Sequence, residues 1–148
     1  MMKILIVDDD NFKRENITNL LTRVSIDCDI SIEKALNPGL RRLFNDKYDI
    51  ILLDMSLPTF DLAETENFDP FGGLAFLQEM KRRNIDTSTI IITQYEIFGE
   101  GSTQHTLNTI DEKCRNEFQN YVGLILYSSS DSAWKEKLVK MLGGLING

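Results

Sequence analysis

Short apolar runs alternate with longer stretches of mixed character along the whole chain. The clearest run is 50–53, four consecutive aliphatic residues, and similar runs occupy 3–7, 88–93 and 121–126. Short, nearly continuous apolar runs are typical of strands that are buried on both faces of a parallel sheet. Residues 28–32 alternate weakly and predict an edge strand. The pattern therefore predicts five strands.

Between these runs, apolar residues recur three or four positions apart, which predicts helices. The predicted helices cover 11–25, 33–46, 74–80, 103–119 and the segment after a predicted N-cap at Ser130. In the second helix, either Asn37 caps a new helix with Pro38 at its first position, or Pro38 kinks a single helix. Strands that alternate with helices predict an α/β fold, a doubly wound five-stranded parallel sheet with helices on both faces.

Carboxylates follow two of the predicted strands. The first strand is followed by Asp8, Asp9 and Asp10, and the strand at 50–53 is followed by Asp54. In an open α/β sheet, ligands lie beyond the carboxyl ends of the strands. Carboxylates that converge there need a cation between them, and hard oxygen ligands suit Mg²⁺. The alternative is that the first three acids cap the following helix; the added carboxylate of Asp54 favours the metal site.

Composition narrows the class of protein. A chain of 148 residues is enough for one domain with a proper core. A net charge of −7 argues against nucleic acid as a direct partner. The sequence has neither an apolar run long enough to cross a bilayer nor a signal-peptide pattern, so we expect a cytoplasmic protein with no membrane partner. Cys28 and Cys114 are too few for a disulfide framework.

Three segments together resemble the receiver domain of two-component response regulators. They are Ile-Leu-Ile-Val-Asp8-Asp9-Asp10, Asp54-Met-Ser-Leu-Pro58 and Ile90-Ile-Ile-Thr93. They occur in the family's order, and the resemblance covers nearly the whole chain. It implies a flavodoxin-like fold and a phosphoryl group received from a histidine kinase or a phosphotransfer protein.

The resemblance also implies roles for individual residues. Asp54 would be the phosphoryl acceptor and a metal ligand, Asp9 a direct Mg²⁺ ligand, and Asp8 a ligand through water. The backbone carbonyl of Ser56 would complete the protein's share of the coordination. Thr93 would donate a hydrogen bond to a phosphoryl oxygen. The family does not require an acid at the position after Asp9, so the third acid of the run is left out of the site.

Several positions depart from the family pattern. The family places a Lys at the end of the fifth strand, where this chain has Tyr127 or Ser128. A hydroxyl can donate a hydrogen bond but supplies no charge, so we expect slower or weaker phosphorylation. The family's aromatic switch residue falls on Leu124 or Ile125, and Gln94 replaces a small residue next to the site. We therefore expect a changed coupling between phosphorylation and conformation, and more crowded access of the phosphodonor to Asp54.

Two connections are longer than the family's. Residues 59–71 carry phenylalanines and acids where the family has a short turn, and the connection at about 94–120 is extended. Long connections in a compact domain are often functional, so 59–71 is either a lid or docking surface or a plain surface loop. We expect residues 1–148 to form a single domain.

These patterns support three hypotheses for function. The first is a stand-alone receiver that is phosphorylated on Asp54, signals through protein contact and is no enzyme beyond promoting transfer to itself. The second, suggested by the missing Lys, is a receiver-like binding module that works without phosphorylation. The third is a haloacid-dehalogenase-type phosphatase built on Asp8-x-Asp10 and Thr93. That class needs a downstream Lys and a further acidic pair that are not evident, and it leaves Asp54 unexplained.

Overall fold

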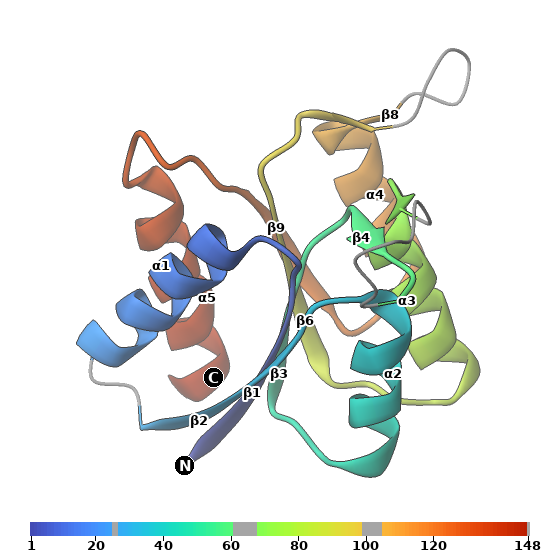
Figure 1. Cartoon of the computed structure of the whole chain (residues 1–148), viewed down its shortest axis with the longest axis horizontal. Coiled ribbons are helices and arrows are strands. Elements are labelled where there is room, and N and C mark those ends of the chain that lie inside the picture. Colours follow the sequence, from blue (N-terminus) through green and yellow to red (C-terminus); the bar gives the residue numbers. More distant parts are fainter. Residues whose placement is uncertain (25–26, 61–67, 99–104, 148) are drawn as a thin grey trace.

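A five-stranded parallel sheet forms the centre of the molecule, in the order β2-β1-β3-β6-β9 (Figure 1). The computed structural model describes residues 1–24, 27–60, 68–98 and 105–147. The strands of this sheet are β1 (Met2–Val7), β2 (Cys28–Glu33), β3 (Ile50–Leu53), β6 (Ser88–Thr93) and β9 (Tyr121–Leu126). All neighbouring pairs run parallel. The predicted sheet is confirmed, and it has the flavodoxin-like strand order.

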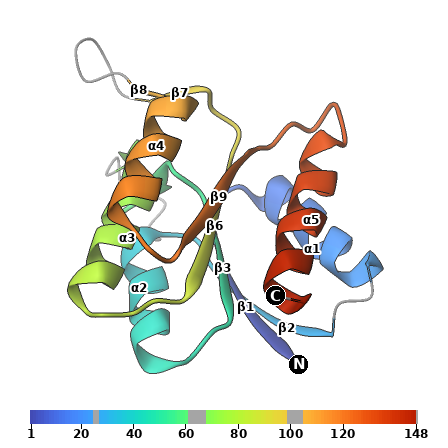
Figure 2. The same cartoon turned by 180° about the vertical axis from the view of Figure 1, so that it is seen from behind.

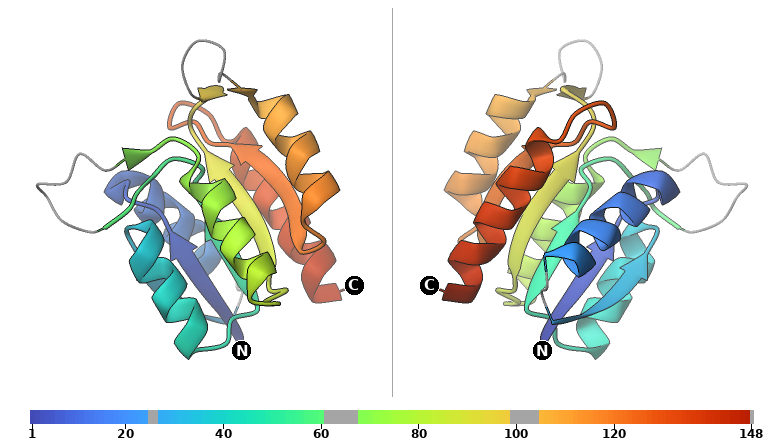
Figure 3. Two further views of the ribbon diagram at one scale, coloured as in Figure 1. Left: turned by 90° about the vertical axis from the view of Figure 1, so that its right-hand side faces the viewer. Right: turned by 90° about the vertical axis from the view of Figure 1, so that its left-hand side faces the viewer.

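Helices cover both faces of the sheet. They are α1 (Asn11–Arg23), α2 (Leu36–Asn45), α3 (Gly72–Arg82), α4 (Leu107–Glu117) and α5 (Ala133–Asn147). Helices α1 and α5 lie on one face, and α2, α3 and α4 lie on the other (Figures 1 and 2). Side views show the sheet edge-on between these two layers (Figure 3). None of the described helices is long and apolar enough to cross a membrane.

The buried side chains form two hydrophobic clusters, one on each face of the sheet. In β3, Ile50 and Leu52 belong to the cluster under α1 and α5, whereas Ile51 and Leu53 belong to the cluster under α2, α3 and α4. Each of the four is at most 1% exposed. Burial of such a side chain contributes roughly 1.5–3 kcal/mol. This two-sided burial explains why the run is continuously apolar rather than alternating.

Two predicted helix starts were wrong. Helix α2 begins at Leu36 with Ala35 as its N-cap, so Asn37 does not cap it and Pro38 lies inside its first turn. Proline is tolerated there because first-turn amides have no partner within the helix. Helix α5 begins at Ala133, whose amide donates to a carboxylate oxygen of Asp131 at 3.1 Å. An acid closer to the helix therefore replaces the predicted cap at Ser130.

In each of the two long connections, two short strands pair in antiparallel fashion. Strand β4 (Leu57–Pro58) pairs with β5 (Phe68–Asp69), and β7 (Ile97–Phe98) pairs with β8 (His105–Thr106). Residues 61–67 and 99–104 lie outside the described residues. The role predicted for the connection at 59–71 therefore stays a prediction.

Candidate functional site

Two neighbouring strands bring the predicted acids together. Val7 at the end of β1 is in register with Leu53 at the end of β3, and the Asp54 amide donates to the Val7 carbonyl at 3.0 Å. Asp8 and Asp54 are 2% and 3% exposed, while Asp9 lies exposed at the rim. One carboxylate oxygen from each of these three acids lies within 4.8 Å of the others. Because these are hard oxygen ligands on a shared edge, the cluster fits a divalent cation.

Asp10 has a different task from its two neighbours. Its carboxylate accepts a hydrogen bond from the Lys13 amide at 3.1 Å and thereby caps α1. Its own amide donates to Asp8 at 2.9 Å, which fixes the Asp8 side chain at the strand end. The capping alternative therefore holds for Asp10, and the metal-site interpretation fits Asp8 and Asp9.

The loop after β3 is held tightly against α3. The Met55 amide donates to the Asp54 carboxylate at 2.8 Å, and the Gly73 amide donates to the Met55 carbonyl at 2.7 Å. Ser56 is 4% exposed, and its hydroxyl donates to the Pro70 carbonyl at 3.2 Å. These bonds orient the Asp54 carboxylate, and the role of the Ser56 carbonyl as a metal ligand stays a prediction.

Thr93 ends β6 beside β3 and is fully buried. Its hydroxyl has no hydrogen-bond partner within the part of the chain that the structure describes. A buried polar group without a partner costs roughly 1–3 kcal/mol. A hydroxyl left in this state beside a carboxylate cluster is suited to bind a ligand oxygen that arrives there.

A lysine that the sequence analysis missed lies at the centre of the cluster. The ammonium of Lys13 lies 2.7 Å from Asp8 Oδ2 and 3.3 Å from Asp54 Oδ2, and its side chain is fully buried. It also donates to the carbonyl of Ile92 in β6. The ammonium thus connects the carboxyl ends of β1, β3 and β6.

The sequence does contain a signal for this lysine. Lys13 lies four, seven and eight positions before Ile17, Leu20 and Leu21, which form the buried stripe of α1. A charged residue on an apolar stripe is buried with the stripe, and a buried lysine requires partners of opposite charge. This spacing therefore indicates the nearby aspartates as its partners.

The electrostatic balance of the site centres on Asp54. Burial raises the pKa of Asp54 to about 6, and the negative charge of Asp8 adds to this rise. Lys13 opposes the rise by charge and by hydrogen bonding. The Thr93 hydroxyl is near enough to oppose it slightly, although its geometry is not that of a hydrogen bond. The pKa of Asp9 is raised by partial burial and by Asp8. Asp54 and Asp9 therefore bind protons more readily than isolated carboxylates do.

Tyr127 directly follows β9 and is one of the two residues, with Ser128, that stand where the family has its lysine. Its amide donates to the Thr93 carbonyl at 2.7 Å. Its hydroxyl accepts a hydrogen bond from Asn16 at 2.8 Å, and its ring packs on Trp134 with centroids 4.9 Å apart. The ring also lies 6.0 Å from the Lys13 ammonium. Tyr127 is therefore engaged with α1 and α5, and it supplies no charge to the site.

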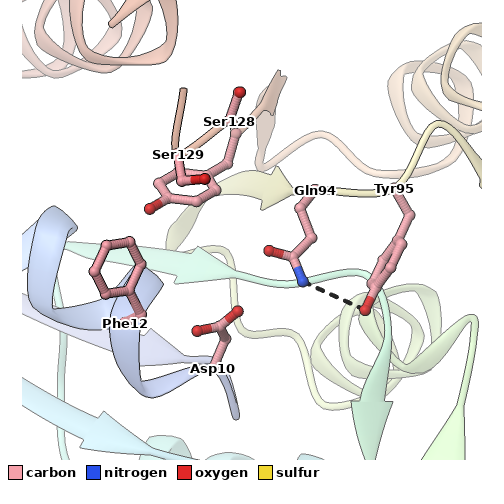
Figure 4. A pocket seen from close by; sticks show the side chains of 7 residues that line it. Asp10, Phe12, Gln94, Tyr95, Ser128 and Ser129 are labelled. Carbon is pink, nitrogen blue, oxygen red and sulfur yellow. Dashed lines mark hydrogen bonds between the residues drawn. The ribbon is translucent and has the colours of Figure 1, made fainter. Parts of the chain in front are cut away.

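An open cavity of about 430 Å³ adjoins the site (Figure 4). Its lining residues are Asp10, Phe12, Gln94, Tyr95, Tyr127, Ser128 and Ser129. Gln94 donates to the Tyr95 hydroxyl at 3.3 Å, as the dashed line in Figure 4 shows.

At the positions of the family's aromatic switch, Leu124 packs on one face of the sheet and Ile125 is buried on the other.

The sheet order and the acids at its carboxyl edge agree with the family that sequence comparison identifies. The profile of the response regulator receiver domain matches residues 4–101, so the chain belongs to that family. Receiver domains are in general signalling domains of two-component systems.

Two curated proteins are similar over nearly their whole lengths. The chain is 32% identical over 147 residues to the Detocs response regulatory protein DtcB of Enterobacter cloacae, covering 95% of this chain and 98% of DtcB. It is 32% identical over 139 residues to the uncharacterized protein y4jR of Sinorhizobium fredii, covering 90% of this chain and 92% of y4jR.

Solved receiver structures share the fold. The receiver domain of the Francisella response regulator 1452 superposes with a TM-score of 0.63 at 20% identity, covering 99% of this chain and 98% of that one. The response regulator TrrA of Thermotoga maritima, in complex with Mg²⁺-BeF, superposes with a TM-score of 0.61 at 21% identity, covering 95% of this chain and 99% of TrrA.

Proposed function

We propose that the protein is a cytoplasmic receiver that accepts a phosphoryl group on Asp54 and signals through contact with another protein. The donor is a histidine kinase or a phosphotransfer protein. One observation carries the proposal: three carboxylates converge at adjacent strand ends, beside the buried Thr93 hydroxyl that lacks a partner among the described residues. The family membership and the name of the relative DtcB support it.

The chemistry is an in-line transfer to a carboxylate. A carboxylate oxygen of Asp54 attacks the phosphorus, the P–N bond of a protonated phosphohistidine breaks, and neutral imidazole leaves. The product is an acyl phosphate on Asp54. Thr93 would donate a hydrogen bond to one phosphoryl oxygen, which would give its hydroxyl the partner it lacks among the described residues.

The acids fit Mg²⁺ as the resident ion. Asp8, Asp9 and Asp54, with the Ser56 carbonyl, would hold it, because their oxygens match its preference for hard ligands. A bound Mg²⁺ supplies positive charge that offsets the oxygens of the transferring group. The structurally similar TrrA was solved in complex with Mg²⁺-BeF, which supports the proposal.

One observation favours the alternative of a binding module that works without phosphorylation. Lys13 already pairs with both buried carboxylates, so the site is partly neutralised without a metal or a phosphoryl group. The phosphatase alternative loses support, because the Asp10 carboxylate caps α1 and does not join the cluster.

Mass spectrometry after incubation with Mg²⁺ and phosphoramidate tests the proposal. We expect an adduct that borohydride trapping locates on Asp54, that requires Mg²⁺ and that is lost in Asp54→Asn. Asp10→Asn is the matched control, because it keeps a capping side chain and should still form the adduct. A wild-type protein that forms no adduct at any Mg²⁺ concentration would support the phosphorylation-independent module. Continuous phosphate release that survives Asp54→Asn would support the phosphatase.

A further inference from the structure

Lys13 lies in a site built for an ammonium group. Its side chain is fully buried, and its three acceptors come from three different strand ends: Asp8 after β1, Asp54 after β3 and Ile92 in β6. A buried lysine is retained only where its charge is compensated, and its position on α1 would otherwise suit an apolar side chain. The packing of the helix therefore does not account for a lysine here.

The chain lacks a cation at the place where its family supplies one. The segment after β9 reads Tyr127-Ser-Ser-Ser130-Asp, and the sequence contains no Lys or Arg between Arg115 and Lys135. The Tyr127 hydroxyl is hydrogen-bonded to Asn16, and its ring packs on Trp134. A phosphoryl group on Asp54 would therefore meet no positive charge from β9.

We propose that Lys13, on α1, takes over the task of the missing strand-end lysine and contacts the phosphoryl group on Asp54. This inference rests on the proposed function. The ammonium lies 3.3 Å from Asp54 Oδ2, so a phosphoryl group bonded to that carboxylate comes within its reach. Lys13 has three N–H donors, and it can bond a phosphoryl oxygen while it keeps its contacts with Asp8 and the Ile92 carbonyl.

The same position makes Lys13 a competitor of the metal before transfer. Asp8 and Asp54 would both help to hold Mg²⁺, and both are paired with the ammonium in this structure. Removal of the ammonium leaves the carboxylates more negative, which favours a divalent cation. Lys13 is therefore expected to weaken Mg²⁺ binding and yet to promote phosphoryl transfer. If Lys13 only held the loops in place, its removal would weaken Mg²⁺ binding and slow phosphoryl transfer together.

The two effects can be measured separately. Trp134 is the only tryptophan, and its ring contacts Tyr127, whose ring lies 6.0 Å from the Lys13 ammonium, so its fluorescence is placed to report Mg²⁺ binding. The rate of Asp54 adduct formation from phosphoramidate, at saturating Mg²⁺, reports the transfer. Lys13→Met removes the charge, and Lys13→Gln also removes it but keeps a donor for Ile92.

The matched control is Lys34→Met. Lys34 is exposed and follows edge strand β2 at the same end of the sheet, so the substitution removes the same charge from the same edge. We expect Lys34→Met to match the wild type in both measurements. Circular dichroism of every variant with Mg²⁺ present checks that the fold is kept.

In both Lys13 variants we expect Mg²⁺ to bind several-fold more tightly. We expect transfer to slow by about 100-fold, the usual effect of removing one charge-stabilising donor. A wild-type rate of transfer in Lys13→Met overturns the inference and leaves the proposed function standing. Parallel loss of Mg²⁺ binding and transfer also overturns it, because it assigns Lys13 a structural role. A wild-type protein that forms no adduct refutes the proposed function itself.

Discussion

The pKa of Asp54 differs clearly from that of an aspartate in solution. Its carboxylate is buried and its pKa is raised to about 6, against 3.8 for an unperturbed aspartate. An acid whose folded-state pKa is raised favours the folded state only once it is protonated. Its contribution to stability is therefore absent at pH 7, appears as the pH falls through 6 and is complete below about 3.8.

This shift predicts a pH dependence of stability in the absence of Mg²⁺. Between pH 7 and pH 5, the wild type should gain about 1 kcal/mol of unfolding free energy relative to Asp54→Asn, which has no carboxyl group to titrate. Urea denaturation of both proteins at the two pH values measures this difference, and shifts common to both proteins cancel. An equal response to pH in the two proteins would show that the pKa of Asp54 is not raised.

Some residues of the candidate site could be predicted from the sequence, and others could not. Asp8, Asp9 and Asp54 could be placed together because parallel strand ends share one edge of a sheet. Lys13 was missed because its signal is its place on the apolar stripe of α1, and the pattern of charges alone does not reveal that. The residues near Tyr127 are close in sequence to the family's lysine position and carry no cation, whereas Lys13 is far away in sequence and close in space to Asp54.

At the level of elements, the close approach of α3 to the loop after β3 depends on glycine. A Cβ on Gly73 would lie 2.8 Å from the Asp54 carbonyl oxygen and 3.0 Å from Met55 Cα, both backbone atoms that cannot move independently. A Cβ on Gly144 in α5 would meet no atom within 4 Å among the described residues. The same substitution should therefore have opposite effects in the two helices.

Gly73→Ala should destabilise the protein by about 1–3 kcal/mol, because α3 or the loop must shift. Gly144→Ala should stabilise it by about 0.5–1 kcal/mol, through the better helix propensity of alanine. Urea denaturation monitored by circular dichroism compares the two variants. Since the displaced backbone belongs to Asp54, Gly73→Ala should also slow adduct formation. A neutral Gly73→Ala would indicate that α3 and the loop separate without cost.

Strands and helices were predictable to different degrees. The five strands of the sheet could be located because two-sided burial produces short continuous apolar runs. Helix starts at Leu36 and Ala133 were misplaced because several residues near each start can cap a helix, and tertiary contacts select among them. The short pairs at the bases of the long connections gave no signal, because two-residue strands have no periodicity.

For the whole molecule, a ligand that binds only the folded state raises global stability. Asp8, Asp9 and Asp54 converge from two strand ends that separate when the chain unfolds, so the unfolded chain has no such cluster. Mg²⁺ should therefore raise the unfolding free energy in proportion to the logarithm of its concentration. The exposed Asp9 is the best residue for a test, because its replacement disturbs the core least.

At a Mg²⁺ concentration about 100 times the dissociation constant, the wild type should gain about 2.7 kcal/mol of unfolding free energy. Asp9→Asn should fold normally but gain much less, because it loses one of the charged ligands. Asp10→Asn, one residue away, should gain as much as the wild type, since Asp10 caps α1 and lies outside the cluster. Urea denaturation with and without Mg²⁺, with Ca²⁺ in parallel, distinguishes a specific site from general screening. Equal gains in all three proteins would mean that the ion acts on overall charge, and that the acids at the strand ends form no metal site.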